Sequence, residues 1–177
     1  IGPADLACDM GLTHDLNAER LWQTVEDAVA RFVGKVKEAE QRIAVASELP
    51  ENFGIDTSLE TLENALVRVI ENAWESYPLD TAAKERDVRV TIAPRSDPDG
   101  TEWVEIAVFD RGQGVDPKVE DTLFDPFVST KNSVGRGLGL TIVKSSVLQM
   151  GGTVSVEPNP GDNGAVARIS LPKERPS

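Results

Sequence analysis

Three stretches of the chain repeat apolar residues at the spacing of an amphipathic helix, and each predicts a main helix of the fold. The first begins after Asn17, a residue type preferred at helix N-caps, and continues at least to Phe32. The second covers about residues 58–77 and the third about residues 137–150. Two glycines follow the third stretch, and we expect them to end that helix.

The other apolar residues favour strands. Alternating positions predict two antiparallel hairpins, and a short apolar run predicts one further strand. The expected strands cover residues 43–46, 88–92, 104–108, 153–157 and 165–171. We expect residues 48–55, which contain proline and glycine, to be a loop. Hairpins mixed with separated helices favour an α/β (α+β) two-layer sandwich: a mixed, mainly antiparallel sheet of about five strands with the three main helices on one face.

The composition limits the possible classes of function. The 177 residues, 40% of them hydrophobic, suffice for one core and one domain. The net charge of −12 repels nucleic acid; it would also repel ATP, so an ATP site would need local donors and a metal ion. Cys8 and His14 are the only residues of their types, which excludes an internal disulfide, a histidine-based triad and a multi-histidine metal site. The chain has neither an apolar run of membrane-spanning length nor a signal-peptide pattern at its start.

The polar face of the second predicted helix carries a candidate metal ligand. At 100° per residue, Asn72 lies opposite the apolar face, beside Arg68 and Glu75. An amide oxygen suits Mg²⁺, which takes hard oxygen donors and keeps several waters, so one protein ligand can suffice. Alone, an exposed helical asparagine carries no functional meaning.

A second candidate follows the strand at residues 104–108. Asp110 stands at the strand end and can accept a hydrogen bond from an exocyclic amino group such as that of adenine. Gly112 and Gly114 would let the backbone approach a flat ring closely. The alternative is a glycine-rich turn with an exposed aspartate.

A third candidate is the glycine-alternating run from Gly135 to Leu140, at the start of the third predicted helix. Successive backbone N–H groups at a helix start suit phosphate oxygens, although a flexible hinge has the same composition. The run lacks the Gly-Lys-Ser/Thr of a P-loop and does not directly follow a strand as a dinucleotide motif does. Lys131, in the long aperiodic loop before it, can reach a phosphate as a point charge or be an ordinary solvated lysine.

Together these motifs resemble the ATP-binding catalytic domain of sensor histidine kinases, in the Bergerat-fold superfamily shared with DNA gyrase and MutL. The resemblance spans about residues 16–172, and its lid region is most similar to the short-lidded, nitrogen-sensor type. The matching segments are residues 69–73 (N box), 110–114 (G1 box), 124–127 (F box) and 135–140 (G2 box).

The resemblance implies a role for each candidate. Asn72 would bind Mg²⁺, and it would form the catalytic set together with Arg68 and Lys131. Residues 115–136 would be the ATP lid. Asp110 would bind the adenine amino group, and the full nucleotide-binding set would be Asp110, Gly112, Gly114, Lys131, Gly135, Gly137, Leu138, Gly139 and Leu140.

Three residues depart from the family pattern. Arg68 stands where many kinases have Asn and the superfamily ATPases have a water-activating Glu. Because that Glu is missing, we expect slow ATP hydrolysis. The Arg68 cation could instead contact a phosphate. Glu75 stands where many kinases have a phosphate-binding Lys. Ala165 stands where the family often has a Thr near the adenine.

The phosphoacceptor histidine of such a kinase is expected on a separate domain. His14 faintly echoes its motif, but the span from His14 to Asn72 is too short for a two-helix dimerisation hairpin and the first catalytic-domain helix. We therefore interpret His14 as incidental. Residues 1–15 are expected to be the remnant of an upstream linker, residues 16–172 the catalytic domain, and residues 173–177 a tail.

The predicted function is binding of Mg-ATP and transfer of its γ-phosphoryl group to a histidine on a dimerisation domain, as part of a two-component system. Two alternatives remain open: a Ser/Thr protein kinase of the anti-sigma-factor type, and a degenerate nucleotide-binding module without phosphotransfer. Expected partners are the dimerisation domain of the same kinase and, indirectly, a response regulator receiver domain. We expect no contact with nucleic acid or membrane, and a cytoplasmic location, either alone or as part of a membrane-bound sensor.

Overall fold

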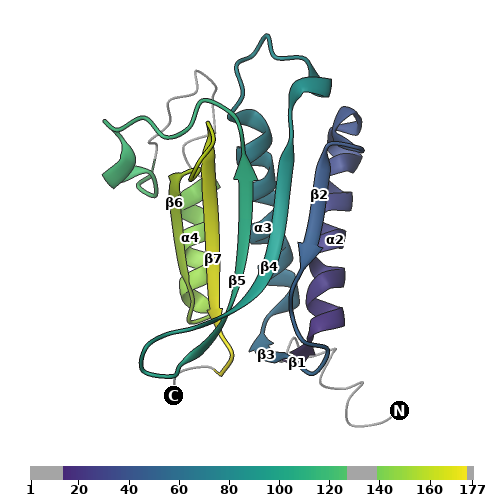
Figure 1. Ribbon diagram of the computed structural model, residues 1–177, viewed down its shortest axis with the longest axis vertical. Helices are drawn as coiled ribbons and strands as arrows, with labels where there is room; N and C mark the ends of the chain where they lie inside the picture. The colour runs from purple at the N-terminus through teal and green to yellow at the C-terminus, as the bar shows by residue number, and fades with distance from the viewer. Residues whose placement is uncertain (1–13, 127–138, 175–177) are drawn as a thin grey trace.

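The computed structural model describes residues 14–126 and 139–174, and its centre is a five-stranded sheet (Figure 1). The strand order is β2-β4-β5-β7-β6, with β2 parallel to β4 and every other neighbouring pair antiparallel. This confirms the predicted mixed, mainly antiparallel sheet. The strands are β2 (Ile43–Ser47), β4 (Val88–Ser96), β5 (Glu102–Asp110), β6 (Thr153–Pro158) and β7 (Ala165–Pro172).

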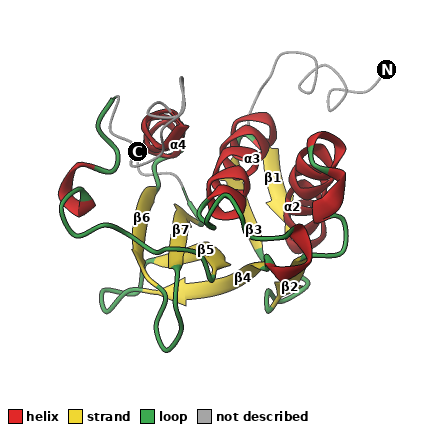
Figure 2. Cartoon of the chain, turned by 90° about the horizontal axis from the view of Figure 1, so that it is seen from above, coloured by secondary structure: helices red, strands yellow, loops and turns green. Residues whose placement is uncertain are grey.

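Three α-helices cover one face of this sheet, as Figure 2 shows from above. They are α2 (Ala18–Lys35), α3 (Leu59–Glu75) and α4 (Gly139–Gln149). In the connections that the structure describes, the short 3₁₀ helices are η1 (Lys37–Ala39), η2 (Ala83–Glu85) and η3 (Glu120–Thr122). The two-layer sandwich with its helices on one face is thus confirmed. Within the described ranges, no helix combines the length and the apolar character that crossing a membrane requires.

Side-chain caps fix where the first two helices begin. The Asn17 carboxamide oxygen accepts from Arg20 N–H at 2.9 Å, which confirms the predicted N-cap of α2. The Ser58 hydroxyl accepts from Thr61 N–H at 3.4 Å at the start of α3. Helix α3 ends at Glu75, so the chain has already left the helix when it reaches Pro78.

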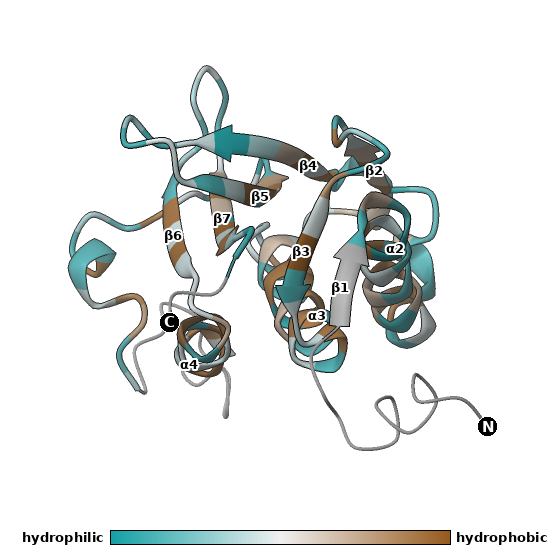
Figure 3. Cartoon of the chain, turned by 90° about the horizontal axis from the view of Figure 1, so that it is seen from below, coloured by the Kyte–Doolittle hydropathy of each residue, from teal (hydrophilic) through white to brown (hydrophobic). Residues whose placement is uncertain are grey.

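The hydrophobic core fills the space between the helices and the inner face of the sheet. Figure 3 shows the hydrophobic segments on both layers. Burying each large aliphatic side chain contributes about 1.5–3 kcal/mol, so this shared core fixes how α3 lies against the sheet. The largest fully buried side chains are Leu21, Phe32, Ile55, Leu62, Leu66, Ile70, Ile92, Ile106, Met150, Ile169 and Leu171.

A second, two-stranded sheet was not predicted. Strand β1 (His14–Asn17) pairs antiparallel with β3 (Gly54–Thr57), so the expected loop at residues 48–55 is wrong at its last two positions. Both strands have only four residues, too few to give an alternating pattern. His14 pairs with Thr57 in this sheet.

Candidate active site

Asp110 is the last residue of β5, the middle strand of the sheet, and only 5% of its surface is exposed. Its Oδ1 atom accepts a hydrogen bond from Gly112 N–H at 2.9 Å and one from Ala165 N–H at 3.3 Å. These donors come from the following turn and from the start of β7. The aspartate is therefore a buried, oriented acceptor, and the alternative of an exposed turn aspartate is wrong.

The turn after Asp110 packs directly against the end of α3. Gln113 N–H donates to the Ser76 carbonyl oxygen at 3.0 Å. A Cβ atom on Gly112 would lie 2.7 Å from the Ser76 carbonyl carbon, so only glycine permits this approach. Gly114 has a φ of +75°, which glycine adopts without strain. Both predicted glycines thus have a structural reason to be there.

This packing places Asn72 one helical turn before the contact with the Asp110 turn. Asn72 and Glu75 are half-buried and Arg68 is exposed, whereas Leu62 and Leu66 on the other side of α3 are fully buried. The predicted polar face of the helix is confirmed. The fold therefore brings Asn72 and Asp110, distant in sequence, to the same end of the α3–β5 layer pair (Figure 1).

The first turn of α4 lies at this same end of the sheet. A tight turn links α4 to β6, and the two run in opposite directions, so α4 begins near where β6 ends beside β7 (Figure 1). Gly139 and Leu140, both half-buried, form this first turn. The Thr141 hydroxyl donates to the Phe124 carbonyl oxygen at 2.9 Å, which docks the preceding loop on α4.

Several predicted site residues lie outside the described part of the chain. These are Lys131, Gly135, Gly137 and Leu138. The predicted lid, residues 115–136, is described only as far as Pro126. In that part it is a loop containing η3.

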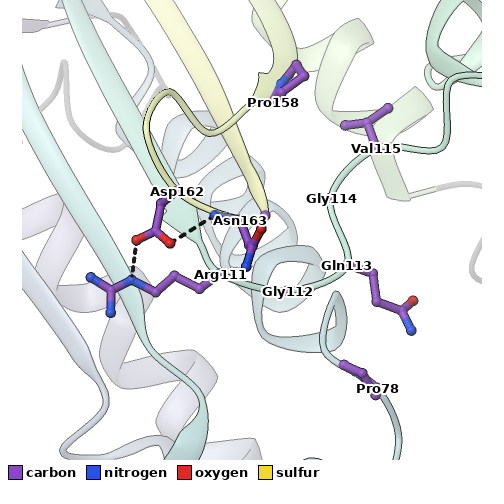
Figure 4. Close-up of a pocket in the computed structure, with 10 residues that line it drawn as sticks. Pro78, Arg111, Gly112, Gln113, Gly114, Val115, Pro158, Asp162 and Asn163 are labelled. Carbon is purple, nitrogen blue, oxygen red and sulfur yellow. Dashed lines mark hydrogen bonds and ion pairs between the residues drawn. The ribbon is translucent and has the colours of Figure 1, made fainter.

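A hollow of about 520 Å³ adjoins the Asp110 turn (Figure 4). It shares Gly112 and Gly114 with the predicted site, but its lining does not include Asp110, Asn72 or Arg68. It therefore lies beside the predicted site. Its lining consists of Pro78, Arg111, Gly112, Gln113, Gly114, Val115, Pro158, Asp162, Asn163 and Gly164.

Tyr77 has a role at the site that the sequence did not indicate. Its phenol oxygen accepts from Arg111 N–H at 3.1 Å and from Asp87 N–H at 3.0 Å, and donates to the Asp87 carbonyl oxygen at 2.7 Å. It thereby joins the segment that follows α3 to the residue before β4 and to the residue after Asp110. Its position on the apolar face of the predicted helix indicated only a packing role. The hydroxyl's partners could not be recognised from the sequence, because they lie outside that helix.

Comparison with known proteins identifies relatives of this arrangement. A family model described as histidine kinase-, DNA gyrase B-, and HSP90-like ATPase matches residues 57–175, a range that contains all four motif segments. Sensor histidine kinase DcuS of Escherichia coli (strain K12) is 36% identical over 115 residues, which are 65% of this chain and 19% of DcuS. C4-dicarboxylate transport sensor protein DctS of Rhodobacter capsulatus is 34% identical over 134 residues, which are 75% of this chain and 19% of DctS. The chain thus spans about a fifth of the length of these relatives.

Solved structures share the fold. The catalytic domain of histidine kinase ThkA matches with a TM-score of 0.72 at 19% identity, covering 92% of this chain and 96% of that domain. The mycobacterial sensor histidine kinase MprB matches with a TM-score of 0.67 at 22% identity, covering 93% of this chain and 100% of that one. ThkA in complex with the response regulator protein TrrA matches at 0.68 and 18% identity, covering 91% of this chain and 42% of that one.

Proposed function

Because the chain belongs to the histidine kinase-, DNA gyrase B-, and HSP90-like ATPase family, we propose that it binds Mg-ATP and donates the γ-phosphoryl group to a histidine on a separate dimerisation domain. Family membership implies ATP binding, and the relatives DcuS and DctS are a sensor kinase and a sensor protein. The observation that carries the proposal is the buried Asp110 carboxylate, held by backbone donors at the end of the central strand.

Base recognition is assigned to Asp110. The adenine amino group would donate to its carboxylate, while Gly112 and Gly114 line the adenine side. Two backbone N–H groups already orient Oδ1, so little conformational freedom is lost when the base binds. A hydrogen bond to a charged acceptor contributes about 1.5–3 kcal/mol, which suits the carboxylate to selecting adenine.

Phosphate and metal binding are assigned to α3 and to the start of α4. Asn72 would hold Mg²⁺ through its amide oxygen; the half-buried Asn72 and Glu75 give this face the oxygen donors that Mg²⁺ prefers. Bound Mg-ATP would supply the transferable phosphoryl group with its charge partly neutralised. Lys131, Gly137 and Gly139 would contact the phosphates, where the N-terminus of α4 favours negative charge. Gly135, Leu138 and Leu140 would complete the nucleotide-binding set.

Arg68 distinguishes this site from that of a vigorous ATPase. Its exposed guanidinium lies one turn before Asn72, and it cannot act as a base toward water because it stays protonated. It would instead contact a phosphate. The chain's residues would thus position the nucleotide and neutralise charge, which is the main protein contribution to phosphoryl transfer.

The acceptor is proposed to lie on the dimerisation domain of the same kinase. A response regulator receiver domain would then receive the phosphoryl group from that histidine, and so meet this chain only indirectly. The ThkA–TrrA complex shows that a kinase sharing this fold assembles with a response regulator. His14 is not proposed as an acceptor, because it lies in the short strand β1 and not on a helix.

Phosphotransfer with γ-labelled ATP and Mg²⁺ tests this proposal. We expect no acid-labile phosphate on the chain alone, and labelled phosphohistidine on a supplied dimerisation domain. His14→Gln is the matched control and should change neither result. Labelling of a serine in a partner protein would instead support the anti-sigma-factor type of kinase. ATP binding without any transfer would indicate a nucleotide-binding module.

A further inference from the structure

The turn that joins β6 to β7, residues 159–164, contacts Asp110 from the β7 side of β5. We propose that Asn159 in this turn is a positioning residue for adenine recognition: its side chain fixes the backbone of Asp110 and thereby the direction of the carboxylate. The inference rests on the proposed function, and it gives a role to a residue outside the four motif segments.

The contact itself is direct. Asn159 Nδ2 donates to the Asp110 backbone carbonyl oxygen at 3.0 Å, across 49 positions of sequence. The side chain is half-buried, and its own backbone N–H donates to the Gly164 carbonyl oxygen at 3.1 Å. Because the partner is a carbonyl oxygen, only the nitrogen of the amide can face it.

The β5–β7 ladder explains why Asp110 needs a side-chain donor. The ladder's last pair is Phe109 with Val166, so Asp110 stands one residue beyond it. On the β4 side, Asp110 pairs with Val88. The Val88 N–H points away from Asp110 and donates to the Arg42 carbonyl oxygen. In an antiparallel sheet this orientation turns the backbone groups of Asp110 toward β7.

The next donor on β7 is used for the carboxylate instead of the backbone. Ala165 N–H, which would otherwise continue the ladder, donates to Asp110 Oδ1 at 3.3 Å. Asn159 Nδ2 supplies the hydrogen bond that the Asp110 carbonyl oxygen would otherwise lack from β7. The turn therefore holds the carbonyl of Asp110, and the first residue of β7 holds its carboxylate.

The consequence is a coupling between the turn and base selection. Without the Asn159 amide, the peptide group after Asp110 loses the hydrogen bond at its carbonyl oxygen, while its Arg111 N–H still donates to the Tyr77 hydroxyl. The carbonyl end can then shift, and with it the carboxylate that accepts from Gly112 N–H. The loss should fall on the hydrogen bond to the adenine amino group, because the proposed phosphate ligands are other residues. A general loosening of the fold would weaken the binding of every nucleotide alike.

Discrimination between ATP and purine riboside triphosphate, which lacks the exocyclic amino group, measures this coupling. Both would compete with a fluorescent ATP analogue in the presence of Mg²⁺. Wild type should bind ATP about tenfold or more tightly than purine riboside triphosphate, because a hydrogen bond to a charged group contributes that much to affinity. In Asn159→Ala this ratio should fall severalfold toward one, mainly through weaker ATP binding. Asn159→Asp, which keeps the shape but removes the donor, should lose at least as much.

Asn163→Ala is the matched control, because Asn163 is exposed on the same turn and its hydrogen bond to Asp162 uses the backbone N–H. It should keep the wild-type ratio. If wild type itself shows no preference for ATP, the proposed assignment of Asp110 fails. If wild type discriminates and both Asn159 variants discriminate equally well, only the positioning role is overturned. Equal weakening toward both nucleotides would also overturn it.

Discussion

At the residue scale, Asp110 shows how much of a site is made by its neighbours. The sequence supplies one carboxylate at the end of a strand, and the fold surrounds it with donors from three places. Gly112 and Ala165 N–H groups hold the carboxylate, and the Asn159 amide holds the backbone. A side chain fixed in this way can select a ligand group by direction as well as by charge.

Gly164 lies against this arrangement and should not tolerate a side chain. It has a φ of +95°, and a Cβ atom there would lie 2.7 Å from Arg111 Cα and from the Asp110 carbonyl carbon. Gly164→Ala should displace Asp110 and lower ATP affinity by about tenfold or more. A fluorescent ATP analogue would measure the loss.

Gly161→Ala controls for backbone strain in that experiment. Gly161 is on the same turn with a φ of +79°, but a Cβ atom there would meet nothing within 4 Å. This variant should lose about 1–2 kcal/mol of folding stability and keep its ATP affinity. Equal affinities in the two variants would contradict the role given to Gly164.

At the element scale, the site depends on where α3 ends relative to β5. The Ser76 carbonyl and the Tyr77 hydroxyl receive N–H groups from the turn after Asp110, and Asn72 lies one turn earlier on the same helix. The metal and adenine assignments are thus tied together by a single helix end.

Tyr77→Phe tests this junction without changing side-chain shape. The change removes one hydroxyl and leaves the backbone N–H groups of Asp87 and Arg111 without that partner. We expect a loss of about 1–3 kcal/mol in the free energy of unfolding, measured by urea denaturation followed by circular dichroism. Unchanged stability would show that the hydroxyl is not needed to hold the turn.

The sequence predicted those elements whose pattern is local. Helices α2 and α3 have long amphipathic repeats, and Asn17 and Ser58 have the side chains that cap them. The pair β1–β3 escaped prediction because four residues are too few for a period. Tyr77 and Asn159 escaped as site residues for another reason: their partners are brought to them only by the folded chain.

At the scale of the whole molecule, the net charge of −12 opposes the binding of a triphosphate. In the proposed function the site offsets that field locally: Asn72 would hold Mg²⁺, and backbone donors at the start of α4 would face the phosphates. Because of this net charge, we expect ATP binding to depend on the metal even though all four motif segments are present in the sequence. Nucleotide binding and metal binding are expected to be one event in this chain.

Titration of the chain with ATP, with Mg²⁺ and then with EDTA, tests the central claim most directly. Calorimetry or a fluorescent ATP analogue should show clear binding with Mg²⁺ and binding at least tenfold weaker in EDTA. Asn72→Ala should reproduce the EDTA result, and Asp110→Ala should lose binding while keeping its circular dichroism spectrum. Equal affinity with and without the metal, or undiminished binding by Asp110→Ala, would contradict this account of the site.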